Sequence, residues 1–308
     1  MRHLIFALQC SALVALRIDT TLRIEPSALR VERRKALAAG CAAVSAAIAT
    51  HASTAAAPRR VLVAGASGRS GREVVKALAA AGYEVVPLVR NASRWRDVAE
   101  RTSLRVVEAD LTDAASLAPA LQNVDDVVCD VGFVPTFDAD ADRRAALAVD
   151  RDGVVALVDA AEKARLPGRF VLVSSLLTGA ESARRANLSY RMLNKLGNVV
   201  EAKRAAEDRL RASALDFVIL RPGVFVDNAQ GGLVFAGEDR FLGEADDARG
   251  LSRVSCKSPF FASSGAACGV TRGQLADACV AALADRDAGR RTVEVVARPG
   301  ATGIARLP

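Results

Sequence analysis

Residues 190–207, YRMLNKLGNVVEAKRAAE, contain the side chains best suited to acid–base chemistry. A tyrosine followed four residues later by a lysine can assist hydride transfer, because the ammonium group lowers the phenol pKa from about 10. Four residues after Tyr190, however, the chain has Asn194, and Lys195 lies one residue late, about 100° further around a helix. The usual Tyr-x-x-x-Lys pair is therefore absent.

Other proton donors are few in this chain. Both histidines, His3 and His51, lie in an N-terminal segment that we expect to be removed, which excludes Ser-His-Asp and Cys-His catalysis and histidine-bound metals from the remainder. The cysteines show no CxxC spacing, so no metal site is predicted. Proton supply would fall to solvent or to one of four side chains: Tyr190 from an unusual position, Lys203, Glu207 or Asp227.

Two of these candidates, and one serine, could instead have purely structural roles. Tyr190 can be an ordinary residue of an amphipathic surface, and Lys203 can pair with Glu207 one helical turn later. Ser175 follows a predicted strand, where it would hydrogen-bond a substrate carbonyl or simply cap the loop.

Alternating strands and helices are expected to position these residues. Short β-branched runs predict strands at 61–64, 84–89, 105–108, 126–129, 170–174, 217–220 and 292–296. Alanine-rich segments predict helices at 70–81, 93–100, 114–121, 141–165, 192–213 and 272–285. Near-continuous apolar strands separated by helices predict an α/β fold with a doubly wound parallel Rossmann sheet.

The first strand leads into a glycine-rich loop, GASGRSG, and then directly into a helix. Gly65 permits a tight turn, Gly68 lets a diphosphate approach the backbone, and Gly71 allows close packing of the helix. The first amide groups of that helix would face the anion. We therefore predict a dinucleotide site that also includes the remaining side chains of the loop, Ser67, Arg69 and Ser70.

The second strand predicts which dinucleotide is preferred. It ends in Arg90, with Arg94 nearby, rather than in the carboxylate that binds the ribose 2′-hydroxyl of NAD. A guanidinium group suits a 2′-phosphate, so NADP(H) is predicted rather than NAD(H), although both arginines would also suit a solvated face. After the third strand, Asp110 and Leu111 would meet the adenine, and Gly132 after the fourth would let the backbone pass the cofactor.

Residues 228–269 interrupt the alternation and are rich in Gly, Ser and Asp, with four scattered phenylalanines. We interpret this segment as a small C-terminal substrate cap, because ligands of open α/β sheets gather at the carboxyl edge. An insertion without function is the alternative. Cys256 and Cys268 in this segment would form a disulfide in an oxidising compartment, whereas Cys129 and Cys279 fit a core.

Residues 1–57 are interpreted as a targeting leader that precedes a Rossmann domain at 58–308. A basic start and a short apolar run are followed by an Arg-rich, acid-poor stretch and small residues at a cleavage-like site. This order fits a complex plastid in an alga, with the stroma or the thylakoid lumen as destination; a disordered tail or a wrong gene start is the alternative. The leader carries +4 of the net charge of +7, so the basic pI predicts no nucleic-acid partner.

Several motifs in order resemble the atypical short-chain dehydrogenase/reductases, in the NAD(P)H-binding group that includes NmrA-like proteins. The resemblance covers about residues 60–298 and rests on VLVAGASGRSG, LVRN, VVEADLTD, FVLVSS, EAKRAAEDRLRASALDFVILRPG and GVTRGQLADACVAAL. It implies that Lys203 binds the nicotinamide ribose. It also implies that the backbone after Arg221, including Pro222 and Val224, lines the nicotinamide pocket.

Two functions follow from these observations. The first is a plastid NADP(H)-binding protein with a redox-sensing or assembly role and a membrane-complex protein as partner. The second is an NADPH-dependent reductase of a flavin, quinone or tetrapyrrole-like small-molecule acceptor, which can take its proton from solvent. A sugar-nucleotide epimerase is disfavoured because that chemistry needs the tyrosine base.

Overall fold

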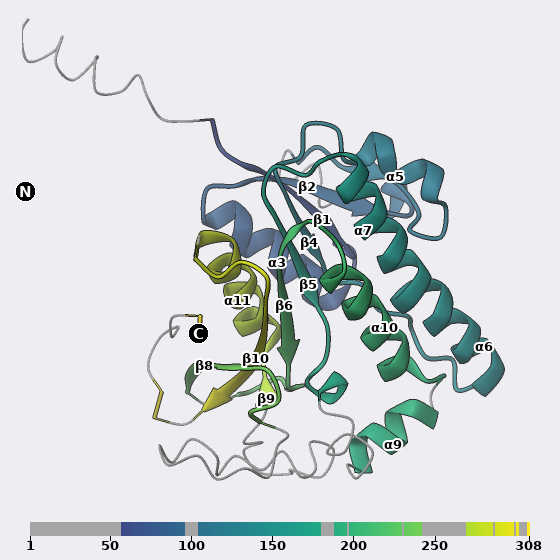
Figure 1. Cartoon of the computed structure of the whole chain (residues 1–308), viewed down its shortest axis with the longest axis vertical. Coiled ribbons are helices and arrows are strands. Elements are labelled where there is room, and N and C mark those ends of the chain that lie inside the picture. The colour runs from purple at the N-terminus through teal and green to yellow at the C-terminus, as the bar shows by residue number, and fades with distance from the viewer. Residues whose placement is uncertain are drawn as a thin grey trace, which may run out of the picture. The chain divides into compact units, whose positions relative to one another are not determined.

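A sheet of eight strands forms the centre of the domain in this computed structural model (Figure 1). The structure describes residues 57–95, 104–179, 188–195, 197–229, 231–241, 269–285, 287–298, 300–301 and 307–308. The strands are β1 (Arg60–Ala64), β2 (Glu84–Val89), β3 (Val107–Glu108), β4 (Asp126–Cys129), β5 (Arg169–Val173), β6 (Asp216–Pro222), β7 (Val224–Phe225), β8 (Gly232–Gly237), β9 (Gly269–Val270) and β10 (Arg291–Arg298). The helices and helical turns are α3 (Arg69–Ala80), η1 (Ala92–Trp95), α5 (Ala114–Ala120), α6 (Ala139–Ala145), η2 (Ala146–Gly153), α7 (Val154–Lys163), η3 (Leu176–Thr178), α9 (Leu188–Lys195), α10 (Val199–Arg211) and α11 (Arg272–Ala284).

The strand order is β3-β2-β1-β4-β5-β6-β10-β8, and the ladders are parallel except between β8 and β10. Strands β7 and β9 form a separate parallel pair. The chain runs outwards from β1 to β3 and then returns to β4 on the other side of β1. This reversal confirms the predicted doubly wound Rossmann sheet, and ligands of such sheets bind at the carboxyl edge beside it.

Both faces of the sheet are covered, because successive residues of a strand point to opposite sides. Val61 and Val63 of β1 pack in one apolar core with residues of α3 and α11, whereas Leu62 and Ala64 pack in a second core with α5, α7 and α10. Figure 1 shows α3 and α11 on one side of the sheet and α7 and α10 on the other. Cys129 and Cys279 are fully buried, one in each core, as expected.

Two predicted helices are not continuous. The helix expected at 141–165 consists of α6, the wider π-helical turn η2, and α7. The helix expected at 192–213 is two helices, α9 and α10, separated by Gly197 and Asn198, which both have positive φ angles. A Cβ atom on Gly197 would lie 2.5 Å from the carbonyl group of Asp142, so this break lets the chain pass close to α6.

The predicted cap segment 228–269 contains β8, which belongs to the main sheet. Its side chains alternate in burial, with Leu233 and Phe235 buried, because β8 pairs with β10 and covers one core. The interpretation of the whole segment as a cap is therefore wrong for residues 232–237. Residues 242–268, with Cys256 and Cys268, lie outside the described residues, as do the leader residues 1–56 and most of the helix predicted at 93–100, of which only the short turn η1 is described.

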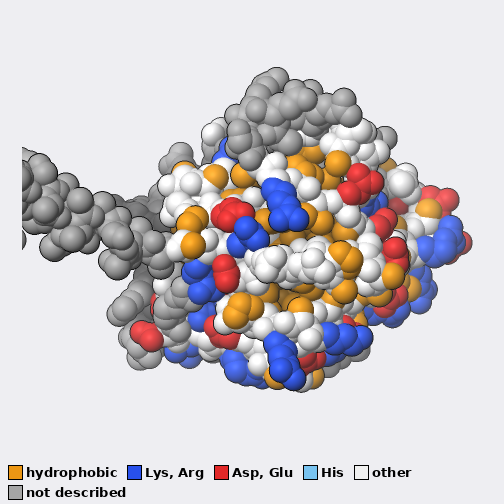
Figure 2. Space-filling view, turned by 90° about the horizontal axis from the view of Figure 1, so that it is seen from above, with side chains coloured by type: hydrophobic (Ala, Val, Ile, Leu, Met, Phe, Trp, Pro, Cys, Tyr) orange, Lys and Arg blue, Asp and Glu red, His pale blue; other side chains and the backbone are white. Residues whose placement is uncertain are grey.

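The surface does not gather charge of one sign on the face shown in Figure 2, where Lys and Arg side chains are interspersed with Asp and Glu. Within the described ranges, no helix is long and apolar enough to cross a bilayer. Nor do those ranges contain a cluster of three or more His, Cys, Asp or Glu side chains arranged to hold a metal ion.

Candidate functional site

The glycine loop lies at the carboxyl edge of the sheet, between β1 and α3. Gly65 has a φ angle of 83°, and a Cβ atom on it would lie 2.1 Å from the carbonyl oxygen of Asp130. A Cβ atom on Gly71 would lie 2.2 Å from the carbonyl oxygen of Gly65. Both glycines are therefore required by close backbone packing. Gly68 is the N-cap of α3 and has no side chain to satisfy the first amide groups of the helix, which stay open to an anion.

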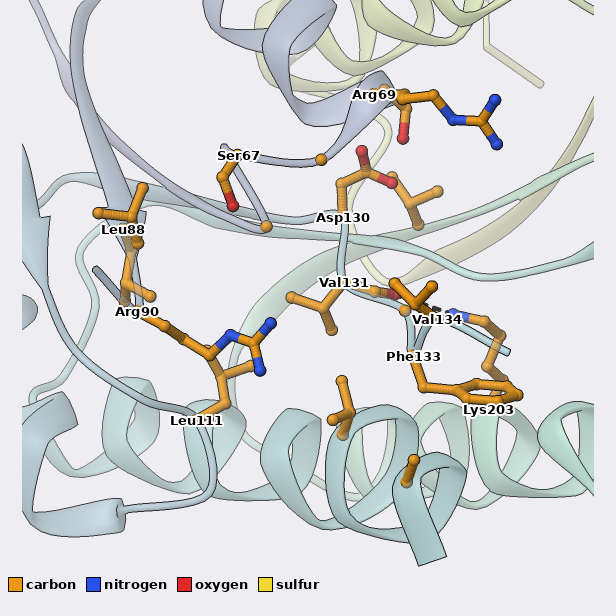
Figure 3. A pocket seen from close by; sticks show the side chains of 18 of the residues that line it. Ser67, Arg69, Leu88, Arg90, Leu111, Asp130, Val131, Phe133, Val134 and Lys203 are labelled. Atoms are coloured by element: carbon orange, nitrogen blue, oxygen red, sulfur yellow. Dashed lines mark hydrogen bonds between the residues drawn. The ribbon is translucent and has the colours of Figure 1, made fainter. Parts of the chain in front are cut away.

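A cavity of about 730 Å³ runs along this edge of the sheet (Figure 3). Ten of the residues predicted to bind the cofactor line it: Gly65, Ser67, Gly68, Arg69, Ser70, Arg90, Asp110, Leu111, Gly132 and Lys203. The structure thus brings together residues that are up to 138 positions apart in the chain, from the loop after β1 to α10. Such a volume is within the range of about 300–1,000 Å³ that is usual for cofactor sites.

Arg90 and Leu111 extend into one end of the cavity (Figure 3). Arg90 is exposed directly after β2, where its side chain is accessible to a ligand. Asp110 lies beside them, and its carboxylate accepts hydrogen bonds from the amide and the hydroxyl group of Thr112 at 2.9 and 2.8 Å. The backbone hydrogen bond from Thr112 is the main reason that the pKa of Asp110 is lowered, so this end of the cavity has an ionised carboxylate that could accept from an amino group.

Lys203 lies at the other end, near Phe133 and Val134 (Figure 3). Its Nζ is 2.9 Å from Oδ1 of the buried Asp150 and donates a hydrogen bond to the carbonyl oxygen of Val131 at 3.1 Å. The other oxygen of Asp150 accepts from the amide of Phe133 at 3.0 Å. Burial acts to lower the pKa of Lys203, but the Asp150 carboxylate outweighs it and the pKa is raised. Lys203 is therefore a cation that holds the loop after β4.

The pairing of Lys203 with Glu207 is wrong. The carboxylate of Glu207 is buried and lies 2.8 Å from the guanidinium group of Arg221, which is buried as well. Glu207 also accepts hydrogen bonds from Ser174 at 2.5 Å and from Thr178 at 2.7 Å. Since Ser174 lines the cavity, this network fixes a hydroxyl group at the cavity wall.

Seven predicted residues do not line the cavity: Glu207 and Asp227, which were candidate proton donors, and the five that follow. Tyr190 is buried against Leu177 and Val200, and its hydroxyl group donates a hydrogen bond to Glu201, so it is not a surface residue. Ser175 caps the turn η3 by accepting from the amide of Leu177. Gly71 in α3, Pro222 in β6 and Val224 in β7 are also not among the residues that line the cavity.

The side chain of Arg94 is not among those that the structure describes.

Several lining residues had not been predicted. Asp130 directly follows the buried strand β4, a position that the sequence pattern could have indicated. Arg272 begins α11, and its guanidinium carbon lies 5.3 Å from the ring centre of Phe225. Phe225 and Arg272 are 47 positions apart, so no local signal connects them. The other residues missed are Leu88, Val89, Thr112, Val131, Phe133, Val134, Ala145, Val149 and Val173.

Comparison with known proteins agrees with this site. The NAD(P)H-binding family matches residues 65–255, which include the glycine loop and most of the cavity, and the chain belongs to this family. A nicotinamide dinucleotide is therefore its cofactor, and the arrangement of the open amide groups and the cavity fits such a molecule.

Relatives and a solved structure extend the comparison. An uncharacterized chloroplastic protein of Arabidopsis thaliana is 30% identical over 244 residues, which cover 78% of this chain and 77% of that protein. The chloroplastic protein TIC 62 of Pisum sativum is 32% identical over 181 residues, covering 53% of this chain but only 32% of its own length. The structure of a Bacillus halodurans protein assigned to the NAD-dependent epimerase/dehydratases has a TM-score of 0.59 and 26% identity, and covers 78% of this chain and 95% of its own.

Proposed function

We propose that this protein binds NADP(H) selectively in a plastid and serves a redox-sensing or assembly role. The observation that carries the proposal is Arg90, which lines the cavity beside Leu111 and Asp110 and forms no ion pair in the described part of the chain. A guanidinium group in that place can bind the 2′-phosphate of NADP(H) through charge-assisted hydrogen bonds. The other cavity-lining residues named above would hold the diphosphate and the ribose.

The lack of a tyrosine or a histidine among the residues that line the described cavity supports binding without turnover. None of the residues that line the described cavity is a tyrosine or a histidine, and position 199, four residues before Lys203, is Val199. Tyr190 uses its hydroxyl group to bind Glu201 and does not line the cavity. The dinucleotide would then act as a ligand that reports the redox state, and a protein of a membrane complex would respond to it.

The plastid location rests on the leader and on the relatives. The N-terminal 57 residues have the composition of a targeting segment, and the two relatives described above are chloroplastic proteins. A complex plastid in an alga, with the stroma or the thylakoid lumen as destination, is the specific form of this proposal.

A second function is an NADPH-dependent reductase. Phe133, Val134, Val149 and Phe225 contribute apolar surface to the cavity, and Val134 is 79% exposed. A flavin, quinone or tetrapyrrole-like acceptor could pack on such side chains and accept a hydride, with its proton taken from solvent. NADPH oxidation in the presence of such acceptors, without any partner protein, would favour this function over the first.

The test of selective binding is a fluorescence titration of the purified protein with NADPH and with NADH. Arg90→Glu should weaken NADPH binding by about 10- to 100-fold, as loss of a hydrogen bond to a charged group costs about 1.5–3 kcal/mol, and should change NADH binding much less. Arg144→Glu, an equal charge reversal at an exposed residue of α6, is the control and should leave both affinities unchanged. Equal losses for both nucleotides in Arg90→Glu would contradict the assignment of Arg90 to the 2′-phosphate.

A further inference from the structure

Asp130 contributes an acidic side chain to the cavity, next to the glycine loop. It follows β4, lines the cavity, and lies between the start of α3 and the loop that contains Val131 and Phe133 (Figure 3). Its backbone packs against the glycine loop, because its carbonyl oxygen would be 2.1 Å from a Cβ atom on Gly65. Its side chain is hydrogen-bonded to Ser70, in the first turn of α3. Asp130 thus lies beside the glycine loop and the first turn of α3, whose first amide groups are open to a diphosphate.

The carboxyl group is poorly compensated. Its Oδ2 atom is buried and has no hydrogen-bond partner among the residues that the structure describes. The nearest positive charges come from two elements: Lys203 on α10, which is engaged with Asp150, and Arg272 at the start of α11. Neither forms an ion pair with Asp130 in the described part of the chain. Burying an ionised carboxylate with one oxygen atom unpaired is costly, so burial favours the neutral form.

The surrounding groups set the proton affinity of Asp130. Burial raises its pKa to about 6, whereas the hydrogen bond from Ser70 and the positive charges of Lys203 and Arg272 act in the opposite direction. On the α11 side, burial and the Asp130 charge both raise the pKa of the Cys279 thiol. Arg69 lines the same cavity from α3, and Asp150 on η2 adds a second carboxylate, which is neutralised by Lys203. At neutral pH the empty site therefore contains mostly ionised Asp130.

A diphosphate at the start of α3 would bring further negative charge next to this carboxylate. Two neighbouring anions repel each other, and one way to relieve the repulsion is to protonate the carboxylate. A neutral carboxyl group can moreover donate a hydrogen bond to a phosphate oxygen, whereas a carboxylate can only accept. The buried Oδ2 atom, which has no partner among the described residues, is the oxygen available for that proton, and rotation of the carboxyl group would turn it toward the cavity that Asp130 lines.

We propose that Asp130 belongs to the dinucleotide site and contacts the diphosphate as a neutral carboxyl group, so that the protein takes up a proton when the dinucleotide binds. This inference rests on the proposed function, because it requires the dinucleotide to occupy the cavity. It adds a ligand-binding residue that also makes the affinity depend on pH.

The pH dependence has a definite sign. Well below pH 6 Asp130 is already protonated in the empty protein, so it adds no pH dependence to the affinity there. Above pH 6 each further pH unit weakens binding by up to tenfold, because one proton must be taken up per dinucleotide. The dependence ends where the pH exceeds the pKa that Asp130 has in the complex.

Isothermal titration calorimetry of the full-length protein with NADPH, between pH 7 and 8.5, measures this proton directly. Repeating the titration in buffers with different ionisation enthalpies gives the number of protons taken up. The 2′-phosphate of NADPH is at least about 90% dianionic in this range, since the second pKa of a phosphate monoester is about 6. We expect an uptake of about one proton in the wild-type protein and none in Asp130→Asn.

The variant should also bind more tightly, because asparagine is neutral at every pH. The gain should be about tenfold at pH 7 and up to about a hundredfold at pH 8, where protonation of the wild-type carboxylate is most costly. Asp140→Asn, at an exposed residue of α6, is the matched control and should behave like the wild-type protein. The proton count of the wild-type protein requires no variant, so it decides the question even if Asp130→Asn fails to fold.

Different failures have different meanings. NADPH binding to the wild-type protein without proton uptake would overturn the role of Asp130 but leave the proposed function intact. Weaker binding of Asp130→Asn at all pH values would also overturn it, because the ionised carboxylate would then be the binding form. An absence of NADPH binding by the wild-type protein would overturn the proposed function and this inference together.

Discussion

Replacing Lys203 by methionine should destabilise the protein before any ligand is considered. Lys203 on α10 and Asp150 on η2 form an ion pair at 2.9 Å, in which the Asp150 side chain is fully buried and the Lys203 side chain is 19% exposed. Methionine keeps the length and much of the apolar contact of the lysine but removes its charge. Asp150 would then be a buried carboxylate whose remaining partner is the amide of Phe133.

The size of the effect follows from this geometry. Two unit charges 2.9 Å apart attract by about 6 kcal/mol at an effective dielectric constant of about 20. Part of this attraction only offsets the cost of desolvation, but removing one partner leaves that cost uncompensated. We therefore expect Lys203→Met to lower the free energy of unfolding by about 3–5 kcal/mol. The double variant Lys203→Met/Asp150→Asn should lose less than the sum of the two single variants.

Urea unfolding of the full-length protein at pH 7 is the assay. Lys163→Met, at an exposed lysine in the last turn of α7, is the control and should change the free energy of unfolding by less than about 0.5 kcal/mol. A Lys203→Met protein that unfolds at the wild-type urea concentration would refute the reasoning, as would additive effects in the double variant.

The double variant also separates two roles of Lys203. If the lysine only holds the loop after β4, a double variant that regains stability should regain NADPH binding. If the lysine also binds the nicotinamide ribose, as the family resemblance implies, binding should stay weak in the double variant. The titration with NADPH therefore distinguishes a positioning residue from a ligand-binding one.

Two further outcomes are expected. Gly71→Ala should destabilise the protein by about 1–3 kcal/mol and weaken dinucleotide binding, because the new methyl group would lie 2.2 Å from the carbonyl oxygen of Gly65. Thermal unfolding measures this effect, and Gly237→Ala, where the new methyl group meets no atom within 4 Å, is the control. A wild-type melting temperature for Gly71→Ala would contradict the packing. Tyr190→Phe should lose about 1 kcal/mol of stability, because it removes the hydrogen bond to Glu201. NADPH binding and any reductase activity should be unchanged. Loss of activity in this variant would mean that the hydroxyl group reaches the substrate.

The sequence predicted most of the sheet because its strands are continuous apolar runs. The prediction for β2 and β4 matches their observed ends, and the carboxyl edge that these strands define carries most of the predicted cofactor residues. The break at Gly197 was missed because the helical pattern continues on both sides of it, and its cause is close packing against α6. Arg272 was missed for a similar reason, since only the folded chain brings it to Phe225.

Tyr190 shows that the sequence does not determine the orientation of a side chain. The sequence places it near Lys203 and gives it the right chemistry, but spacing alone does not say where its hydroxyl group points. The Tyr190 side chain packs against Leu177 of η3 and Val200 of α10, and its hydroxyl group donates a hydrogen bond to Glu201 on α10. Side-chain orientation thus depends on contacts that are distant in the chain.

The start of α10 at Val199 has a consequence for how a cofactor is used. Val199 lies one turn before Lys203 on the same helix, where a tyrosine would complete an acid–base pair, and instead it packs against Leu177, Tyr190 and Val200. The helix therefore keeps the lysine of the site while the position for the proton donor contributes to packing. Under the proposed redox-sensing function, a nucleotide bound beside this helix would be retained rather than oxidised, and the occupied site would act as a signal for as long as the cellular pool maintains it.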